Sequence, residues 1–216
     1  MSSPILIAGL GNPGAEYAST RHNAGAMALA GVAERMGQVD RFKKKFDGEV
    51  AAGTLAGRPC VLLCPATYMN DSGRSVGAAA SFYRVVPADV IVLHDELDLP
   101  FGQVRVKLGG GHAGHNGLRS IIASLGTPEF VRVRIGIGRP PAAFAGEVAD
   151  YVLSSFSAAE RVELPAMLAL AADAATQVVS DGLERAMNRI NTRPASAGQG
   201  GAGPSPGVGK IKAAAV

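Results

Sequence analysis

The chain has 216 residues, of which 47% are hydrophobic, so it can bury one sizeable core but not two. With 18% charged residues and a net charge of +3, it has the composition of a globular protein, which excludes a disordered or fibrous chain. No apolar run approaches the roughly 18 residues of a membrane helix, and the start MSSPILIAGL is unlike a signal peptide, so we expect no membrane contact.

Strand and helix patterns alternate along the first third of the chain. The apolar run from Pro4 to Gly9 predicts a buried strand, and a polar loop follows it. Asn23 is placed to cap a helix that runs to Met36. Residues 48–65 predict two strands with Gly57 in the turn between them.

The pattern continues to about residue 190. The further predicted elements are helices over 72–84, 114–126 and 158–190, and strands over 90–94, 103–108 and 130–138. Strands that alternate with helices indicate a single three-layer α/β/α domain. Because its second and third strands are adjacent in sequence, we expect a mixed, mostly parallel central sheet.

The composition changes at Pro194, where Gly, Pro, Ala and Ser begin to dominate. Such a segment cannot bury enough apolar surface to become ordered. We therefore expect a catalytic domain over residues 1–193 and a flexible tail over 194–216.

The two cysteines, Cys60 and Cys64, lie in the apolar run CVLLC. Alternation places both on one face of a strand, where buried thiols behave as small hydrophobic groups. A metal or redox pair is the less favoured alternative, because no other cysteine could complete it. Two buried thiols predict a reducing, cytoplasmic location.

Gly9, Gly11 and Gly14 have the G-x-G-x-x-G spacing of a dinucleotide-binding loop. In that motif the helix begins inside the glycines, and an acidic residue ends a second strand roughly 20 residues later. Here a polar stretch follows, the predicted helix begins near Asn23, and the acids near that distance belong to a helix and its exit. We therefore reject a nucleotide oxidoreductase and expect no cofactor.

All four histidines lie in loops that follow predicted strands: His22, His94, His112 and His115. Ligands gather where the strands of an α/β sheet end. Neighbours at a strand end point to opposite faces, so only one of His94 and Asp95 can enter a shared site. Asp95 is the better choice, because a carboxylate can orient an imidazole. Without a nucleophilic serine or cysteine nearby, the pair suggests a base that acts on water.

A metal site is the main chemical alternative, with His112 and His115 joined by Asp95 or Asp98. The glycine-rich context of the two histidines lacks the helical spacing of a ligand pair, so we favour water activation and no metal. The amides of Asn12, Asn70 and Asn116 could hold a carbonyl or its oxyanion, although each taken alone is explained by turn formation.

Positive charge gathers in RFKKKF (41–46), RVK (105–107) and RVRIGIGR (132–139). Such clusters can meet phosphates. For Arg41 to Lys45 a solvated face is an equally good explanation, so a contact with RNA stays open there.

Four blocks together resemble the bacterial peptidyl-tRNA hydrolase family: GLGNPGAEYASTRHNAG, PATYMNDSG, HDELDLPFGQVRVKLGGGHAGHNGLRSI and RVRIGIGRP. The resemblance covers Ile5 to about Asn191, in the order and spacing of the family. It implies a monomeric α/β enzyme with a mixed sheet. Such an enzyme hydrolyses the ester between the C-terminus of a peptide and the 3′ ribose of tRNA, without a metal.

The resemblance also implies roles for individual residues. His22 matches the catalytic base that activates water, and Asp95 matches the carboxylate that orients it. Asn12 and Asn70 match amides that position the carbonyl or the water. Asn116 matches a contact to the peptide or to the tRNA 3′ end.

Five further positions match the family. Tyr17 and Met69 match residues that line the cleft, and His115 matches a loop position near the site. Lys107 and Arg134 match basic residues that grip tRNA phosphates, which gives affinity without a base preference.

Three other functions are weighed against this hypothesis. A non-catalytic RNA-binding protein would use the basic clusters equally well but would not need the His–Asp pair. A metal-dependent hydrolase would lose activity on chelation. A nucleotide oxidoreductase is least favoured, because the glycine motif fails both of its context tests.

Overall fold

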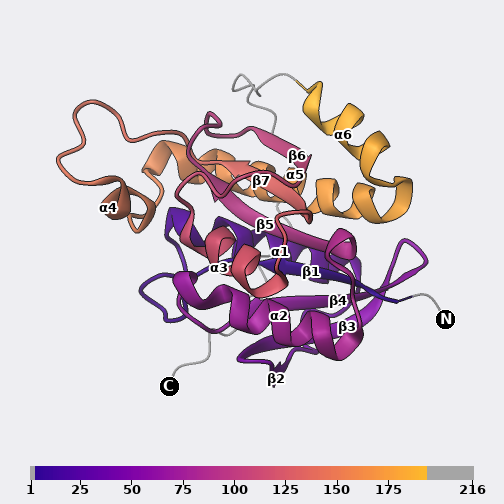
Figure 1. Ribbon diagram of the computed structural model, residues 1–216. Helices are drawn as coiled ribbons and strands as arrows, with labels where there is room; N and C mark the ends of the chain where they lie inside the picture. Colours follow the sequence, from indigo (N-terminus) through magenta and orange to yellow (C-terminus); the bar gives the residue numbers. More distant parts are fainter. Residues whose placement is uncertain (1–2, 194–216) are drawn as a thin grey trace.

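The chain is described by a computed structural model over residues 3–193, so the predicted tail, 194–216, lies outside the described residues. Seven strands form one sheet in the order β2-β3-β4-β1-β5-β7-β6 (Figure 1). Their bounds are β1 Ile5–Gly9, β2 Lys43–Lys45, β3 Gly48–Leu55, β4 Arg58–Pro65, β5 Val90–Glu96, β6 Val104–Leu108 and β7 Val131–Gly136. The central strands β4, β1, β5 and β7 are parallel, whereas β2, β3 and β6 are antiparallel to their neighbours. The predicted mixed sheet is therefore confirmed.

Helices cover both faces of this sheet. They are α1 Ala24–Arg35, α2 Ser72–Tyr83, α3 Asn116–Leu125, α4 Val148–Val152, α5 Ala158–Asp181 and α6 Leu183–Asn191. Apolar residues of α1, α5 and α6 pack on one face of the sheet, and those of α2 and α3 pack on the other. This is the three-layer α/β/α arrangement expected from the sequence. Two short 3-10 turns, η1 Arg21–Asn23 and η2 Met69–Asp71, precede α1 and α2.

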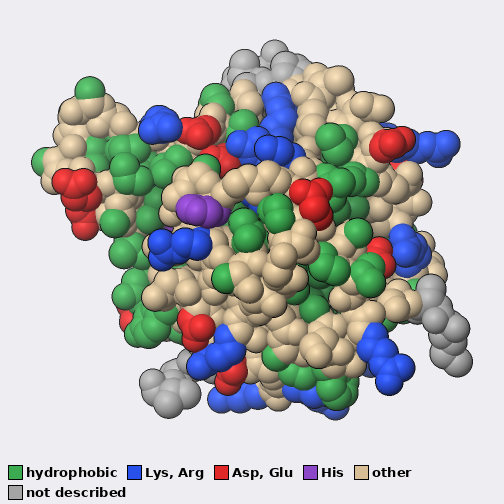
Figure 2. Space-filling view, viewed as in Figure 1, with side chains coloured by type: hydrophobic (Ala, Val, Ile, Leu, Met, Phe, Trp, Pro, Cys, Tyr) green, Lys and Arg blue, Asp and Glu red, His purple; other side chains and the backbone are tan. Residues whose placement is uncertain are grey.

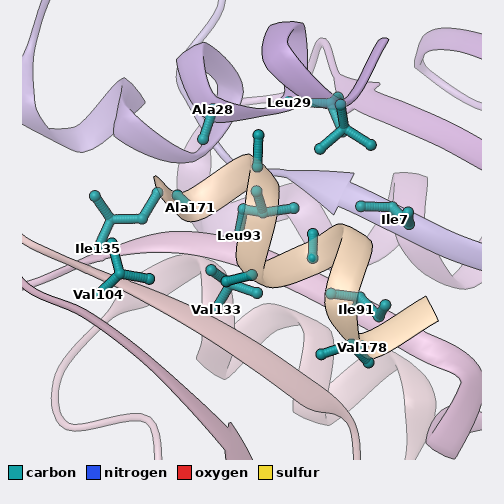
Figure 3. Close-up of a cluster of buried hydrophobic side chains, with 14 of the residues drawn as sticks. Ile7, Ala28, Leu29, Ile91, Leu93, Val104, Val133, Ile135, Ala171 and Val178 are labelled. Carbon is teal, nitrogen blue, oxygen red and sulfur yellow. The ribbon is translucent and has the colours of Figure 1, made fainter. Parts of the chain in front are cut away.

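The core consists of two clusters, and the larger one lies between the sheet and the helices α1 and α5. Ile7 of β1 and Leu93 of β5 are fully buried there, beside Ala28 of α1 and Ala171 of α5 (Figure 3). Small alanine side chains on the helices let their backbones approach the branched side chains of the strands. Cys60 is buried in the same cluster and Cys64 packs against it, as predicted for apolar thiols. Burial raises the pKa of both thiols, that of Cys64 to about 12, which keeps them protonated and unreactive.

Helix α5 is long and apolar enough to cross a membrane by length and composition alone, with a mean hydropathy of 1.3. No such segment was expected from the sequence. In the structure, Ala171, Ala175 and Val179 of this helix are buried in the core that α1 and α5 form with one face of the sheet. Those contacts are typical of the core helix of a globular domain.

The glycines after β1 allow α1 to approach the sheet closely. A Cβ atom on Gly25 would lie 2.1 Å from the carbonyl oxygen of Leu93, and one on Gly9 would lie 2.6 Å from that of Gly25. A Cβ on Gly11 would lie 2.8 Å from the side chain of Asn23. Only Gly14 of the G-x-G-x-x-G set has a positive φ, at 105°. Gly9 and Gly11 therefore allow close packing around the start of α1.

Candidate active site

Three side chains from different parts of the chain meet at the carboxyl end of β5. The carboxylate of Asp95, near the end of β5, lies 2.9 Å from Nδ1 of His22 in η1. The other Asp95 oxygen lies 3.0 Å from the same nitrogen. Nε2 of His115, which precedes α3, lies 3.0 Å from Asp95 Oδ1. All three side chains are almost completely buried, so one carboxylate serves two imidazoles.

The backbone of α3 fixes the tautomer of His115. Its Nδ1 accepts hydrogen bonds from the amides of Gly117 and Leu118, at 3.1 and 3.3 Å, and so caps the helix. A nitrogen that accepts from an N–H carries no proton. The ring proton of neutral His115 is therefore on Nε2, where it is donated to Asp95.

The same reasoning assigns the tautomer of His22. An ionised carboxylate only accepts hydrogen bonds, so Nδ1 of His22 must donate to Asp95. In the neutral ring this leaves Nε2 without a proton. His22 thus has a basic nitrogen on the side away from its carboxylate partner.

The charge of Asp95 is held by its two partners. Burial alone would raise the pKa of this carboxyl, but the facing rings of His22 and His115 and their hydrogen bonds outweigh burial and hold the pKa well below its usual range. Asp95 therefore remains ionised throughout the neutral range.

Buried contacts also anchor η1, which carries His22. The guanidinium of Arg21 is buried and lies 2.6 Å from Glu160 of α5. It stacks 4.4 Å from the ring centroid of Tyr151 in α4. Arg21 thereby ties the turn beside His22 to two helices.

His94 lies behind the cluster of His22, Asp95 and His115, as expected from strand alternation. Its ring packs edge-on against that of His115, with centroids 5.1 Å apart, and its Nδ1 lies 2.7 Å from the backbone carbonyl of Asp95. Its Nε2 is buried without a hydrogen-bond partner among the described residues. Burial, aided by His115, lowers the pKa of His94 to about 3, so the ring is neutral.

Asn12 is held by Asn23 and by the turn η2. Oδ1 of Asn23 accepts from the backbone amide of Asn12 at 2.8 Å, and Nδ2 of Asn23 donates to the Asn12 carbonyl at 2.9 Å. Asn23 is the N-cap of α1 by position, but its side chain makes no capping hydrogen bond. The predicted cap is correct in place, whereas the side chain instead joins two loops.

The side-chain oxygen of Asn12 is also occupied, because it accepts from the backbone amide of Met69 at 2.7 Å. That leaves the Nδ2 group of Asn12 as its available donor. Within the described residues Asn12 makes no hydrogen bond to His22, and the two are connected through Asn23, the neighbour of His22.

These groups open onto a cleft of about 660 Å³. Every predicted catalytic and substrate-binding residue lines it: Asn12, Tyr17, His22, Met69, Asn70, Asp95, His115 and Asn116. Asn70 and Asn116 are exposed at its surface, whereas Met69 is buried. His112 also lines the cleft, so all the described histidines except His94 reach it.

Helix α4 forms a further wall of the cleft. This helix was not predicted from the sequence. Val148, Val152 and Leu153 line the cleft together with Leu97. Val148 and Leu153 are 45% and 41% exposed, which is high for such apolar side chains. A helix of five residues is too short to show a periodic pattern, and its capping box starts with a glutamate, Glu147. Only that E-x-x-D spacing could have indicated it.

The three-residue cluster also has the ligand types of a metal site, since its donor atoms lie within 4.8 Å of one another. The tautomer of His115 argues against ligation. A metal on Nε2 would require the proton on Nδ1, which faces the amides of Gly117 and Leu118. Among the described residues, the donor atoms of His112 and His115 with Asp95 or Asp98 form no such group, and Asp98 pairs instead with Arg139.

The two predicted phosphate-binding residues lie outside the cleft, on β6 and β7. Residues paired across these strands share a face, and the registers place Arg105 opposite Arg134 and Lys107 opposite Arg132. Figure 2 shows Lys and Arg side chains gathered over these strands, near a histidine that is visible at the surface. Arg134 is paired with Glu96 at 3.0 Å, and Arg132 is buried against the carbonyls of Gly110 and Gly111. Lys107 is exposed.

Comparison with known proteins gives one consistent result. The family model described as peptidyl-tRNA hydrolase matches residues 6–198. The chain is 58% identical over 190 residues to a peptidyl-tRNA hydrolase of Sorangium cellulosum, covering 88% of this chain and 85% of that protein. It is 54% identical over 191 residues to that of Mycolicibacterium vanbaalenii, covering 88% and 98%. The crystal structure of the Acinetobacter baumannii peptidyl-tRNA hydrolase is similar, with a TM-score of 0.78, 40% identity and coverage of 89% and 96%.

Proposed function

Since the chain belongs to the peptidyl-tRNA hydrolase family and cleaves the ester of peptidyl-tRNA, we propose that His22 is the general base of this hydrolysis. The supporting observation is the hydrogen bond from His22 Nδ1 to Asp95, which leaves Nε2 free to take a proton from water. Imidazole is a suitable base near neutral pH.

In this mechanism, water attacks the ester carbonyl carbon while its proton passes to Nε2 of His22. The carboxylate of Asp95 stabilises the imidazolium that forms. When the tetrahedral intermediate collapses, the ribose 3′ oxygen leaves and takes that proton. The products are a free peptide carboxylate, after loss of a proton to solvent, and tRNA with a 3′ hydroxyl.

Asn12 is the proposed donor to the oxyanion of the intermediate. Its Oδ1 already accepts from Met69, so the group that it presents to substrate is the Nδ2 amide. A neutral donor of this kind stabilises the charge that develops on the carbonyl oxygen.

The remaining residues of the cleft divide between the peptide and the tRNA. We assign Asn70 and Asn116 to polar groups of the peptide backbone or the tRNA 3′ end, with Tyr17 and Met69 lining the path. Hydrogen bonds to the peptide amide would distinguish peptidyl-tRNA from aminoacyl-tRNA, because a missing partner leaves a polar group unpaired. Lys107 and Arg134 would contact phosphates.

We also propose that the enzyme acts as a monomer in the cytoplasm. Each side chain assigned to catalysis comes from this one chain, so the site needs no second copy. Gel filtration of the purified protein at micromolar concentration tests this proposal.

The central experiment measures release of peptide from N-acetyl-aminoacyl-tRNA by wild-type and His22→Ala protein. We expect loss of turnover in the variant with retained tRNA binding, because His22 supplies chemistry and not affinity. Full activity of the variant would remove His22 from the mechanism. Binding without turnover by the wild-type protein would contradict hydrolysis itself.

A further inference from the structure

We propose that the surface formed by β2 and the end of α2 is a second RNA-binding site, which takes a single-stranded segment. This β2–α2 surface consists of Arg41, Lys43, Lys44, Lys45, Phe82 and Tyr83. It lies apart from the catalytic cleft and goes beyond the proposed function.

Charge is the first observation. The three residues of β2 are consecutive exposed lysines. They border a shallow groove of about 490 Å³, whose lining includes Arg41 and Tyr83 and no carboxylate among the described residues. None of these cations takes part in an ion pair in the described part of the chain; the nearest acid by strand register is Glu49, opposite Lys44. An unneutralised basic groove attracts a polyanion.

Aromatic rings beside the lysines are the second observation. Phe46, Phe82 and Tyr83 form a cluster with ring centroids 5.0–5.8 Å apart. Nζ of Lys45 lies 3.4 Å from the centroid of Phe82, yet that residue is still 59% exposed. Contacts with Phe46, Tyr83 and Lys45 hold the ring in place while it remains accessible. Rings beside basic side chains are the arrangement on which proteins stack unpaired bases.

The turn before β3, which carries Phe46 of this cluster, has an unfavourable backbone conformation. Phe46 and Asp47 both have positive φ, 56° and 49°, in the two-residue turn between β2 and β3. That conformation is strained for a residue as large as phenylalanine. Contacts of the Phe46 ring with Phe82 and Tyr83 stabilise the strained turn.

The need to protect an edge strand explains only some of the residues of the β2–α2 surface. Lysines on an edge strand prevent pairing with other chains, and β2 is such a strand. This role does not require Arg41 in the groove or an exposed Phe82. The combination of cations and rings favours a nucleic acid.

The surface is distant from the basic residues assigned to the substrate. β2 and β6 are at opposite ends of the seven-stranded sheet, about 29 Å apart at about 4.8 Å per strand. Figure 2 shows Lys and Arg side chains both over β6 and β7 and along the lower edge, where β2 lies in Figure 1. No residue lines both the groove and the catalytic cleft.

The test is binding of fluorescent octauridylate, followed by anisotropy over a range of salt concentrations. The variant Arg41→Gln/Lys43→Gln removes two charges that line the groove, and Arg58→Gln/Arg185→Gln removes two exposed charges elsewhere. We expect the first pair to weaken binding at least fivefold more than the second. It should also reduce the slope of log K against log salt by about 1.4, since each phosphate contact on a single strand contributes about 0.7.

Phe82→Leu keeps an apolar side chain but removes the ring, and we expect it to weaken octauridylate binding about fivefold. Duplex RNA of equal nucleotide number should bind more weakly to the wild-type protein, because paired bases cannot stack on the ring. Equal binding by the two charge variants, or duplex binding as tight as single-strand binding, would overturn the proposal. Turnover of saturating N-acetyl-aminoacyl-tRNA should be unchanged in Arg41→Gln/Lys43→Gln, which separates this test from that of the catalytic mechanism.

Discussion

His22 and Asp95 are 73 positions apart in sequence, yet His22 Nδ1 lies 2.9 Å from Asp95 Oδ1. The adjacent parallel strands β1 and β5 explain this proximity, because both end at the same edge of the sheet. His22 follows β1 through a loop, and Asp95 lies at the end of β5. The topology thus brings the proposed base and its carboxylate partner together.

Asp95→Asn should reduce turnover about 10³–10⁴-fold, as expected for a carboxylate that holds a catalytic imidazole in its active tautomer. An asparagine has one acceptor oxygen, whereas two imidazole N–H groups now donate to Asp95. The amide NH₂ group would face one of these N–H groups and could not accept its hydrogen bond. Single-turnover rates with N-acetyl-aminoacyl-tRNA measure this loss, and a decrease below tenfold would contradict the role of Asp95.

His115 has two separable functions, which two variants distinguish. His115→Asn can still cap α3 but cannot reach Asp95, whereas His115→Ala loses both contacts. We expect both to lose activity about 10- to 100-fold, the usual value of a hydrogen bond to a charged group. Only His115→Ala should also lose about 1 kcal/mol of unfolding free energy, from the missing cap. Urea unfolding provides that comparison; equal stability of the two variants would exclude the capping role.

Asn12→Asp tests the oxyanion donor without disturbing the loop. A carboxylate can still accept from the amide of Met69, as Oδ1 of Asn12 does. It offers no N–H group and places negative charge near the developing oxyanion. Turnover should fall about 10²–10³-fold. The unfolding midpoint should match that of the wild-type protein, and wild-type turnover by the variant would exclude Asn12 as the donor.

His94 should make stability depend on pH. Burial lowers its pKa from 6.5 to about 3, so between these values the unfolded chain binds a proton that the folded chain does not. Acid therefore favours unfolding. The contribution of neutral His94 to the free energy of unfolding is fully present above about pH 6.5 and is lost as the pH falls toward 3. Between about pH 7.5 and about pH 5, the wild-type protein should lose about 2 kcal/mol more than His94→Asn. Urea unfolding at both pH values measures this difference, and equal losses would contradict it.

The sequence predicted the fold well, because most of its elements have strong periodic patterns. Ala24–Arg35 and Ser72–Tyr83 became helices within one residue of the expected bounds. The turn at Gly57 formed as expected, with φ of 78°. The edge strand β2 was not predicted, since three lysines show no alternation of apolar and polar residues.

The residues expected to form the cleft were named from the sequence, and so was the pairing of His22 with Asp95, but the other hydrogen bonds of the candidate site were not. Asn23 was assigned to the cap of α1, and only the structure places its amide on the backbone of Asn12. The tautomer of His115 depends on two backbone amides of a helix whose start cannot be located to a single residue from sequence. Local patterns carry no information about such pairings across space.

The paired hydrogen bonds between Asn12 and Asn23 have a practical consequence for protein engineering. They join the two ends of the intervening loop, so they hold Asn12 at a fixed distance from the start of α1. Ala18 and Ser19 are exposed on its outer side. They lie in a turn that two hydrogen bonds from Thr20 to the Tyr17 carbonyl close, so a dye-labelled cysteine in place of Ser19 would report from beside the cleft without lengthening that turn.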